Sequence, residues 1–149
     1  MPDAPTGALV LDTHVWIWTI EGDRTQLSSA ALRRIERASE RGEVLISAIS
    51  VWEVAMLAAK GRISLSRPVD EWVRAALRAP GSALLSLTPE IAIDSTRLPG
   101  SPPGDPADRI LIASARVTGG SLATRDRAIL DYAKEAHVRV TSARPQATA

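Results

Sequence analysis

The chain of 149 residues is 45% hydrophobic and 23% charged, which predicts a single globular domain with a sizeable core rather than a disordered chain or a coiled coil. It contains no cysteine, so disulfides, thiolate metal sites and cysteine nucleophiles are excluded. Its formal net charge of +1 gives no overall basic field of the kind that marks non-specific DNA-binding proteins.

The first predicted strand lies close to the N-terminus. Residues 1–7 are rich in proline and small residues and predict a flexible lead-in. The apolar run 8–11 is typical of a strand buried on both faces of a parallel sheet. Because Asp12 and His14 interrupt this run, we expect neither a signal peptide nor a transmembrane span, and we expect a cytoplasmic protein. Asp12 stands where the strand ends, at the edge where α/β proteins bind their ligands.

The rest of the chain alternates between short apolar runs and amphipathic segments. We expect strands over 44–47, 83–87, 121–124 and 138–140, and helices over 28–41, 50–60, 69–79, 88–98, 108–118 and 126–135. Ser28 and Thr88 are predicted N-caps, and Gly42 and Gly119 are placed to end helices. This alternation predicts an α/β fold with a mostly parallel sheet. Its core spans about residues 8–140, followed by a flexible tail over 141–149.

Four acidic residues occupy positions that this fold brings to one edge of the sheet. Asp12 ends the first strand, Glu53 lies early in the helix after the second, Asp108 opens the helix after the proline-rich loop 98–106, and Asp126 follows the strand 121–124. The carboxyl ends of parallel strands share one edge, so these side chains can converge. With no cysteine and two distant histidines, a metal site here needs oxygen ligands, which suits Mg²⁺ or Mn²⁺.

Such a site favours one kind of chemistry. Divalent cations offset the repulsion among clustered carboxylates, polarise a phosphoryl oxygen and lower the pKa of bound water. We therefore expect metal-dependent hydrolysis of phosphodiester bonds.

Each acid also has a purely structural interpretation. Glu53 could close a capping box that starts at Ser50, although it is the only charged residue between Leu45 and Ala59. Asp12 could be a turn residue that bonds to nearby amides. The other acids could stabilise helix starts, namely Asp105, Asp108 and Asp126. For Asp105 we prefer the role of a helix cap.

Three segments carry a resemblance to a known family: LVLDTHVWIW, ISAISVWEVAMLAAKGRI and LPGSPPGDPADRILIASARVTGGSLATRD. The chain resembles PIN-domain ribonucleases, specifically the VapC-type toxins of bacterial toxin–antitoxin (VapBC) modules, over about residues 8–140. The resemblance implies a three-layer α/β/α fold and an Mg²⁺- or Mn²⁺-dependent endoribonuclease acting on RNA. The family's acids fall on Asp12, Glu53, Asp108 and Asp126, which would be both metal ligands and catalytic residues.

The resemblance also implies a homodimer and inhibition by a cognate antitoxin. Asp105 matches a recurrent acid of the subgroup, and Thr124 matches a hydroxyl position beside the site, although a plain strand-end role is equally open. Three arginines could contact RNA phosphates or an antitoxin, although we prefer ion pairs with nearby acids for them: Arg109, Arg116 and Arg125. Three tryptophans could stack a base, although we prefer core packing or a partner surface for them: Trp16, Trp18 and Trp52.

Two other functions remain possible at this point. A haloacid-dehalogenase-like phosphatase also places an aspartate after its first strand, but it normally has a second aspartate where this chain has His14. A non-catalytic PIN-like module that binds RNA or regulates a partner would keep the fold without cleavage.

Overall fold

The computed structural model describes residues 7–145. Residues 1–6 and 146–149 lie outside this range, and with them most of the expected lead-in and part of the expected tail.

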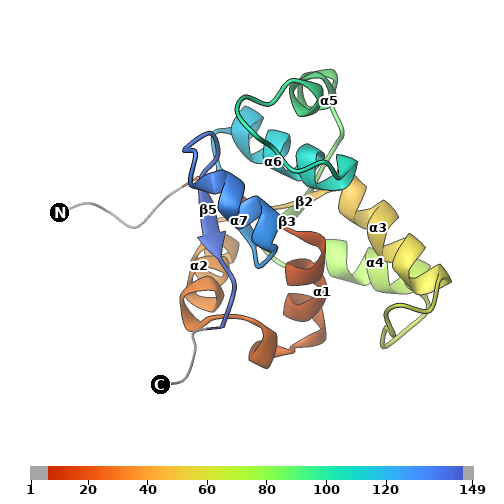
Figure 1. The fold of residues 1–149 in the computed structure, drawn as a ribbon. Helices are drawn as coiled ribbons and strands as arrows, with labels where there is room; N and C mark the ends of the chain where they lie inside the picture. Colours follow the sequence, from red (N-terminus) through yellow and green to blue (C-terminus); the bar gives the residue numbers. More distant parts are fainter. Residues whose placement is uncertain (1–6, 146–149) are drawn as a thin grey trace.

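A five-stranded parallel sheet forms the centre of the molecule (Figure 1). The strand order is β3-β2-β1-β4-β5, with β1 pairing both β2 and β4. All pairs are parallel, so the strands end at one common edge. The strands are β1 (Leu9–Leu11), β2 (Val44–Ser47), β3 (Ser82–Leu85), β4 (Ser121–Thr124) and β5 (Val140–Ser142).

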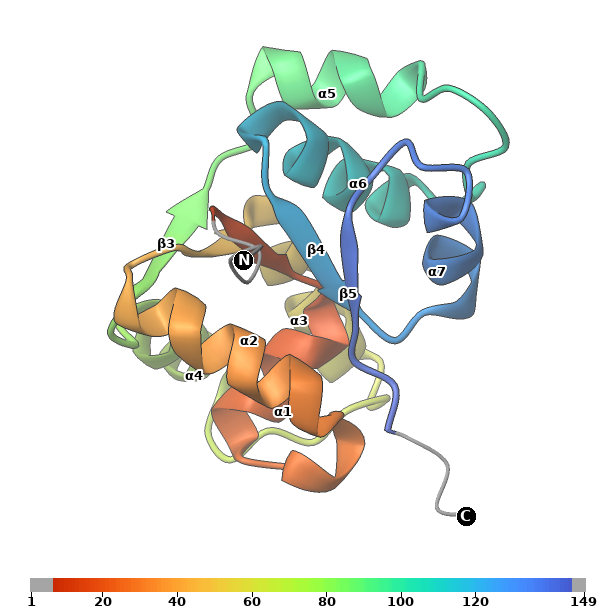
Figure 2. The same ribbon diagram turned by 90° about the vertical axis from the view of Figure 1, so that its left-hand side faces the viewer.

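Helices cover both faces of the sheet, which gives the three-layer α/β/α arrangement (Figure 2). One face is covered by α1 (Thr13–Glu21), α2 (Ser29–Glu40), α3 (Ala48–Ala59) and α4 (Val69–Leu77), and a short 3₁₀ turn, η1 (Arg24–Gln26), follows α1. The other face is covered by α5 (Pro89–Thr96), α6 (Pro106–Thr118) and α7 (Arg127–Ala133). No helix within residues 7–145 is long and apolar enough to cross a membrane.

The strands are apolar on both sides because each side meets a different helical layer. In β1, Leu9 and Leu11 pack into the core that includes α1, α2 and α4. Val10, between them, points into the core formed with α6 and α7. This alternation is why the first strand reads as a continuous apolar run rather than as an alternating one.

The predicted elements are present, with ends within two residues of those expected, but one helix was missed. The segment THVWIWTI is rich in β-branched and aromatic residues, which are poor helix formers, yet it folds as α1. Tertiary burial of Thr13, Val15, Trp16 and Ile17 overrides that local preference.

The position of one strand also differs from the expectation. The last strand is Val140–Ser142 rather than 138–140, so it enters the expected flexible tail, because Val140 pairs with Leu122 in the parallel ladder.

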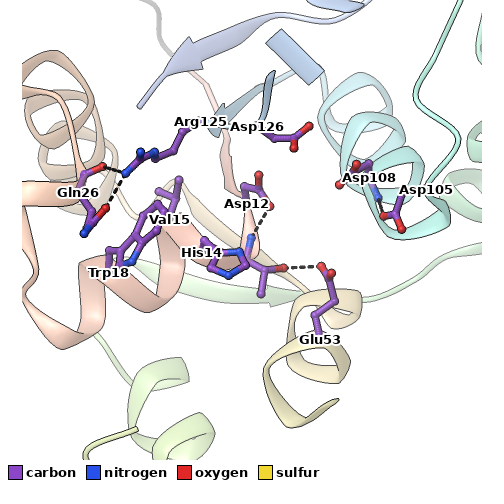
Figure 3. A pocket seen from close by; sticks show the side chains of 11 residues that line it. Asp12, His14, Val15, Trp18, Gln26, Glu53, Asp105, Asp108, Arg125 and Asp126 are labelled. Carbon is purple, nitrogen blue, oxygen red and sulfur yellow. Dashed lines mark hydrogen bonds between the residues drawn. The ribbon is translucent and has the colours of Figure 1, made fainter. Parts of the chain in front are cut away.

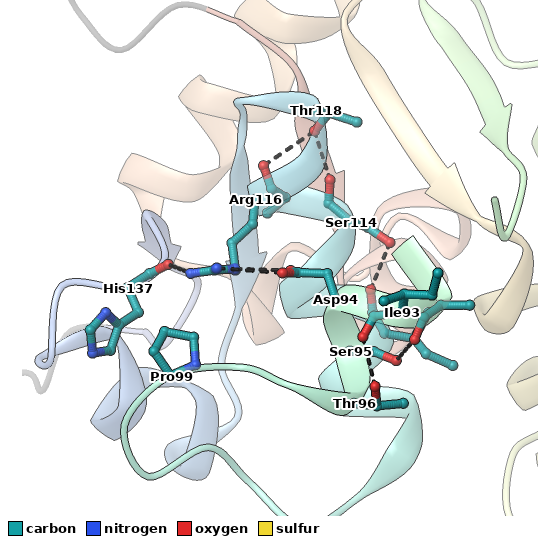
Figure 4. Close-up of polar contacts among 12 residues, drawn as sticks. Ile93, Asp94, Ser95, Thr96, Pro99, Ser114, Arg116, Thr118 and His137 are labelled. Atoms are coloured by element: carbon teal, nitrogen blue, oxygen red, sulfur yellow. Dashed lines mark hydrogen bonds and ion pairs between the residues drawn. The ribbon is translucent and has the colours of Figure 1, made fainter. Parts of the chain in front are cut away.

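A partly buried ion pair joins α5 to α6 (Figure 4). Arg116 Nε donates to Asp94 Oδ2 at 2.9 Å, and Arg116 Nη1 donates to the carbonyl of His137 at 2.7 Å. The pair with an acid was expected for Arg116. It ties three segments together at the end of α6 opposite Asp108.

Candidate active site

The acidic residues meet in one pocket at the edge where the strands end (Figure 3). The cavity has a volume of about 530 Å³. Its walls come from α1, η1, α3, α6 and the β4–α7 loop. They include all four predicted site acids and Asp105, namely Asp12, Glu53, Asp105, Asp108 and Asp126.

Asp12 is held by donors on both of its oxygens. Oδ1 accepts from the amide of Thr13 at 2.7 Å, so Asp12 is also the N-cap of α1. Oδ2 accepts from the hydroxyl of Thr124 at 2.5 Å, which gives this strand-end threonine an orienting role. Burial raises the pKa of Asp12, and the two hydrogen bonds partly offset that rise because they favour the charged form.

Glu53 is oriented by α1 rather than by its own helix start. The helix α3 begins at Ala48 with Ser47 as its cap, so the capping box from Ser50 is wrong. Ser50 is fully buried, and its hydroxyl lies 2.9 Å from that of Thr13. Thr13 Oγ1 in turn donates to Glu53 Oε1 at 2.6 Å. Burial, more than the nearby Asp12, raises the pKa of Glu53.

Asp108 carries the strongest electrostatic signal in the pocket. It lies in the first turn of α6, whose N-cap is Asp105, as expected: Asp105 Oδ2 accepts from the Asp108 amide at 3.0 Å. The Asp108 carboxyl group accepts no hydrogen bond from any residue in 7–145. Burial and then repulsion from Asp126, Asp105, Asp12 and Glu53 raise its pKa to about 7.

Asp126 is the most exposed of the four. Its Oδ2 caps α7 by accepting from the Ile129 amide at 3.0 Å, so the structural interpretation holds for one of its oxygens. The Asp126 amide donates to the hydroxyl of Thr124 at 3.0 Å. Thr124 therefore links Asp126 to Asp12 across the pocket.

The donor chemistry fits a hard divalent cation. All the acidic ligand candidates offer carboxylate oxygens, and their mutual repulsion raises proton affinity, which a cation would relieve. As they stand, no three acidic or histidine side chains of the described chain are close enough to form a complete ligand set. The fit to a divalent cation therefore rests on the chemistry of the donor atoms and on their negative charge.

Several residues of the pocket were not predicted. No sequence motif singles out Thr13 or Gln26, although Thr13 directly follows Asp12.

The ion pairs expected for two arginines are wrong. Arg109 Nε donates to the carbonyl of Pro103 at 2.7 Å, and Arg125 has no carboxylate partner among residues 7–145.

The tryptophans divide between two environments. Trp16 is fully buried against Trp72, with ring centroids 5.0 Å apart, as expected for a core residue. Trp18 is half-buried and lines the pocket. Trp52, on α3, is 58% exposed.

Comparison with known proteins agrees with this arrangement. Residues 9–135 match the PIN domain family. The chain is 39% identical over 125 residues to Ribonuclease VapC22 from Mycobacterium tuberculosis, covering 83% of this chain and 91% of that protein.

Solved structures share the fold at low identity. A crystal structure of VapBC2 from Rickettsia felis, bound to a DNA fragment from its promoter, has a TM-score of 0.65 and 11% identity over 91% of this chain and 98% of that one. DNA-bound VapBC from Salmonella typhimurium has a TM-score of 0.62 and 18% identity over 92% of this chain and 98% of that one. The chain therefore belongs to the PIN-domain family and is a homologue of the VapC ribonucleases.

Proposed function

We propose that this chain is a divalent-metal-dependent endoribonuclease and the toxin of a toxin–antitoxin pair. One observation carries the proposal: five carboxylates from four parts of the chain line a single pocket at the carboxyl edge of a parallel sheet. The 39% identity to a ribonuclease over most of the chain supports RNA as the substrate. The alternative of a haloacid-dehalogenase-like phosphatase has no support once the family is known.

The metal would be held by Asp12, Glu53, Asp108 and Asp126, directly or through water. VapC nucleases of the PIN family depend on divalent metal ions in general, and we propose Mg²⁺ or Mn²⁺ here. When bound, the ion would polarise a phosphoryl oxygen and lower the pKa of water.

Hydrogen-bond donors orient two of these acids, Asp12 and Glu53, and partly offset the effect of burial on their charged forms. Thr124 and the Thr13 amide hold Asp12 at a fixed orientation, with one donor on each oxygen. The Thr13 hydroxyl fixes one oxygen of Glu53 and leaves the other without a partner in residues 7–145. Such outer contacts orient metal ligands and tune their basicity.

Further parts of the proposal concern partners and location. The structural neighbours are toxin–antitoxin complexes, which supports an antitoxin partner. We also propose that the chain forms one domain with its core at about residues 8–140, that it is a homodimer and that it works in the cytoplasm. Light scattering of the purified chain tests the dimer.

The nuclease is tested with the purified chain and a mixture of cellular RNAs. We expect cleavage with Mn²⁺ or Mg²⁺, none with EDTA, and a loss of at least about 100-fold in Asp12→Asn. Asp70→Asn, a change at an exposed surface pair, is the matched control and should cleave normally. RNA binding without turnover under either ion would instead support the non-catalytic module. Release of phosphate from p-nitrophenyl phosphate with intact RNA would support a phosphatase.

A further inference from the structure

The pocket has two chemically different ends (Figure 3). Asp105 and Asp108 lie at one end, and Asp12 lies near the middle. Arg125 and Trp18 lie at the other end, where α1 and η1 meet the β4–α7 loop. The carboxylates at the first end account for a cation site, but they leave this second end without a role.

Arg125 is held in place by neutral acceptors. Its Nη1 donates to the carbonyl oxygen of Gln26 at 3.0 Å and to Gln26 Oε1 at 2.7 Å. Its guanidinium carbon lies 5.0 Å from the centroid of the Trp18 ring. No carboxylate in residues 7–145 is within 4.0 Å of Arg125, although Asp126 is the next residue. The positive charge is therefore fixed in position without being neutralised.

An aromatic surface lies beside this charge. The His14 ring is exposed, and its centroid lies 5.6 Å from that of Trp18. Trp18 is half-buried and faces the pocket, unlike Trp16 two residues earlier, which is part of the core. Aromatic rings next to a fixed cation match the two parts of a nucleotide, a base and a phosphate.

We propose that Arg125, Trp18 and His14 form a subsite for the nucleotide next to the scissile phosphate of single-stranded RNA. Arg125 contacts that nucleotide's phosphate, and its base stacks against the two rings. This inference rests on the proposed ribonuclease function and adds where the RNA is held.

Two physical arguments favour this ligand. The chain's net charge is only +1, and its pocket is rich in carboxylates, so no general basic field draws a polyanion in. The fixed charge of Arg125 at one end of the pocket therefore sets the position of the RNA strand. In addition, a base inside a duplex is already stacked on both faces, whereas a base of a single strand is free to stack on protein rings.

The test measures RNA binding apart from cleavage. We compare Asp12→Asn with Asp12→Asn/Arg125→Gln and Asp12→Asn/Trp18→Leu, using a labelled single-stranded RNA of mixed sequence in Mg²⁺. Each added change should weaken binding about tenfold. Arg125→Gln should also lower the slope of log Kd against log salt by about 0.7, the value for one phosphate contact of a single strand, while Trp18→Leu leaves that slope unchanged.

The controls separate this inference from the proposed function and from misfolding. Arg33→Gln removes the same charge from an exposed position on α2 and should change neither Kd nor slope. Arg125→Lys keeps the charge, so it should retain the slope, and melting curves show whether each variant folds. Equal Kd and salt slope in Asp12→Asn and Asp12→Asn/Arg125→Gln would overturn the proposed subsite. That conclusion would hold even if Arg125→Gln weakened binding to a protein partner. Failure of the unsubstituted chain to cleave any RNA refutes the ribonuclease instead, because the binding comparison in the Asp12→Asn background does not depend on cleavage.

Discussion

Replacing Asp108 by asparagine should stabilise the metal-free protein at neutral pH. The change removes a charge that burial, and after it the repulsion from neighbouring carboxylates, makes unfavourable, and it keeps the shape of the side chain. The amide of residue 108 still donates to Asp105, so the start of α6 is kept. In most proteins a polar substitution at a half-buried site destabilises, so a gain here would be diagnostic.

The size of the effect follows from the raised pKa. A shift from the ordinary 3.8 to about 7 corresponds to about 4 kcal/mol in favour of the protonated form of Asp108. Because the carboxyl group is only half-buried, solvent weakens both the burial penalty and the repulsion, and we expect about 1–2 kcal/mol in the free energy of unfolding. For a chain of this size that is about 2–8 °C in the melting temperature.

The pH dependence has a definite sign. Between about pH 4 and 7 the folded chain binds more protons at Asp108 than the unfolded chain does, so this group makes the free energy of unfolding fall as the pH rises. Above about pH 7 its contribution is constant. The difference between Asp108→Asn and the parent should therefore be near zero at pH 4 and reach its full value by pH 8.

Urea or thermal unfolding in EDTA at pH 4.5 and pH 8 measures this difference. Asp70→Asn is the control, because its exposed pair with Arg74 should change stability by less than about 0.5 kcal/mol. Added Mn²⁺ should stabilise the parent and stabilise Asp108→Asn less, since a ligand to the ion is lost. A variant no more stable than its parent at pH 8 in EDTA would refute the argument that burial and repulsion make the Asp108 charge unfavourable.

Three further changes test the site and its scaffold. Thr124→Val removes the hydroxyl donor to Asp12 and should lower RNA cleavage about 10–100-fold with little change in melting temperature; unchanged turnover would contradict an orienting role. Arg116→Ala leaves a half-buried carboxylate without its partner and should cost about 1–3 kcal/mol of unfolding free energy, with faster hydrogen exchange in α5; exchange no faster than in the parent would count against the ion pair as the tether of that helix. Gly120→Ala places a Cβ against the backbone just before β1 and should cost about 1–3 kcal/mol in urea unfolding, whereas Gly104→Ala, with open space around it, should stay within about 0.5 kcal/mol; equal costs would show that the close approach is unimportant.

Much of the fold could be predicted from local patterns. The strands Val44–Ser47 and Ser121–Thr124 are short apolar runs between helices, and they occur with the expected bounds. The helix starts at Ser28 and Thr88 could be predicted because each cap side chain accepts a hydrogen bond from an amide in the first turn of its own helix. By contrast, α1 was hidden, since its residues have weak helix propensity and only burial makes it helical.

The sequence by itself determined which acids are available and, because parallel strands share one carboxyl edge, that they face one crevice. Only the tertiary structure decided how each is used. It brings the Thr13 hydroxyl to Glu53, 40 positions along the chain, and the Thr124 hydroxyl to Asp12, 112 positions away. It also leaves Arg125 beside a tryptophan instead of an acid. Such contacts depend on how α1, α3 and β4 pack, and no local pattern in the chain specifies that packing.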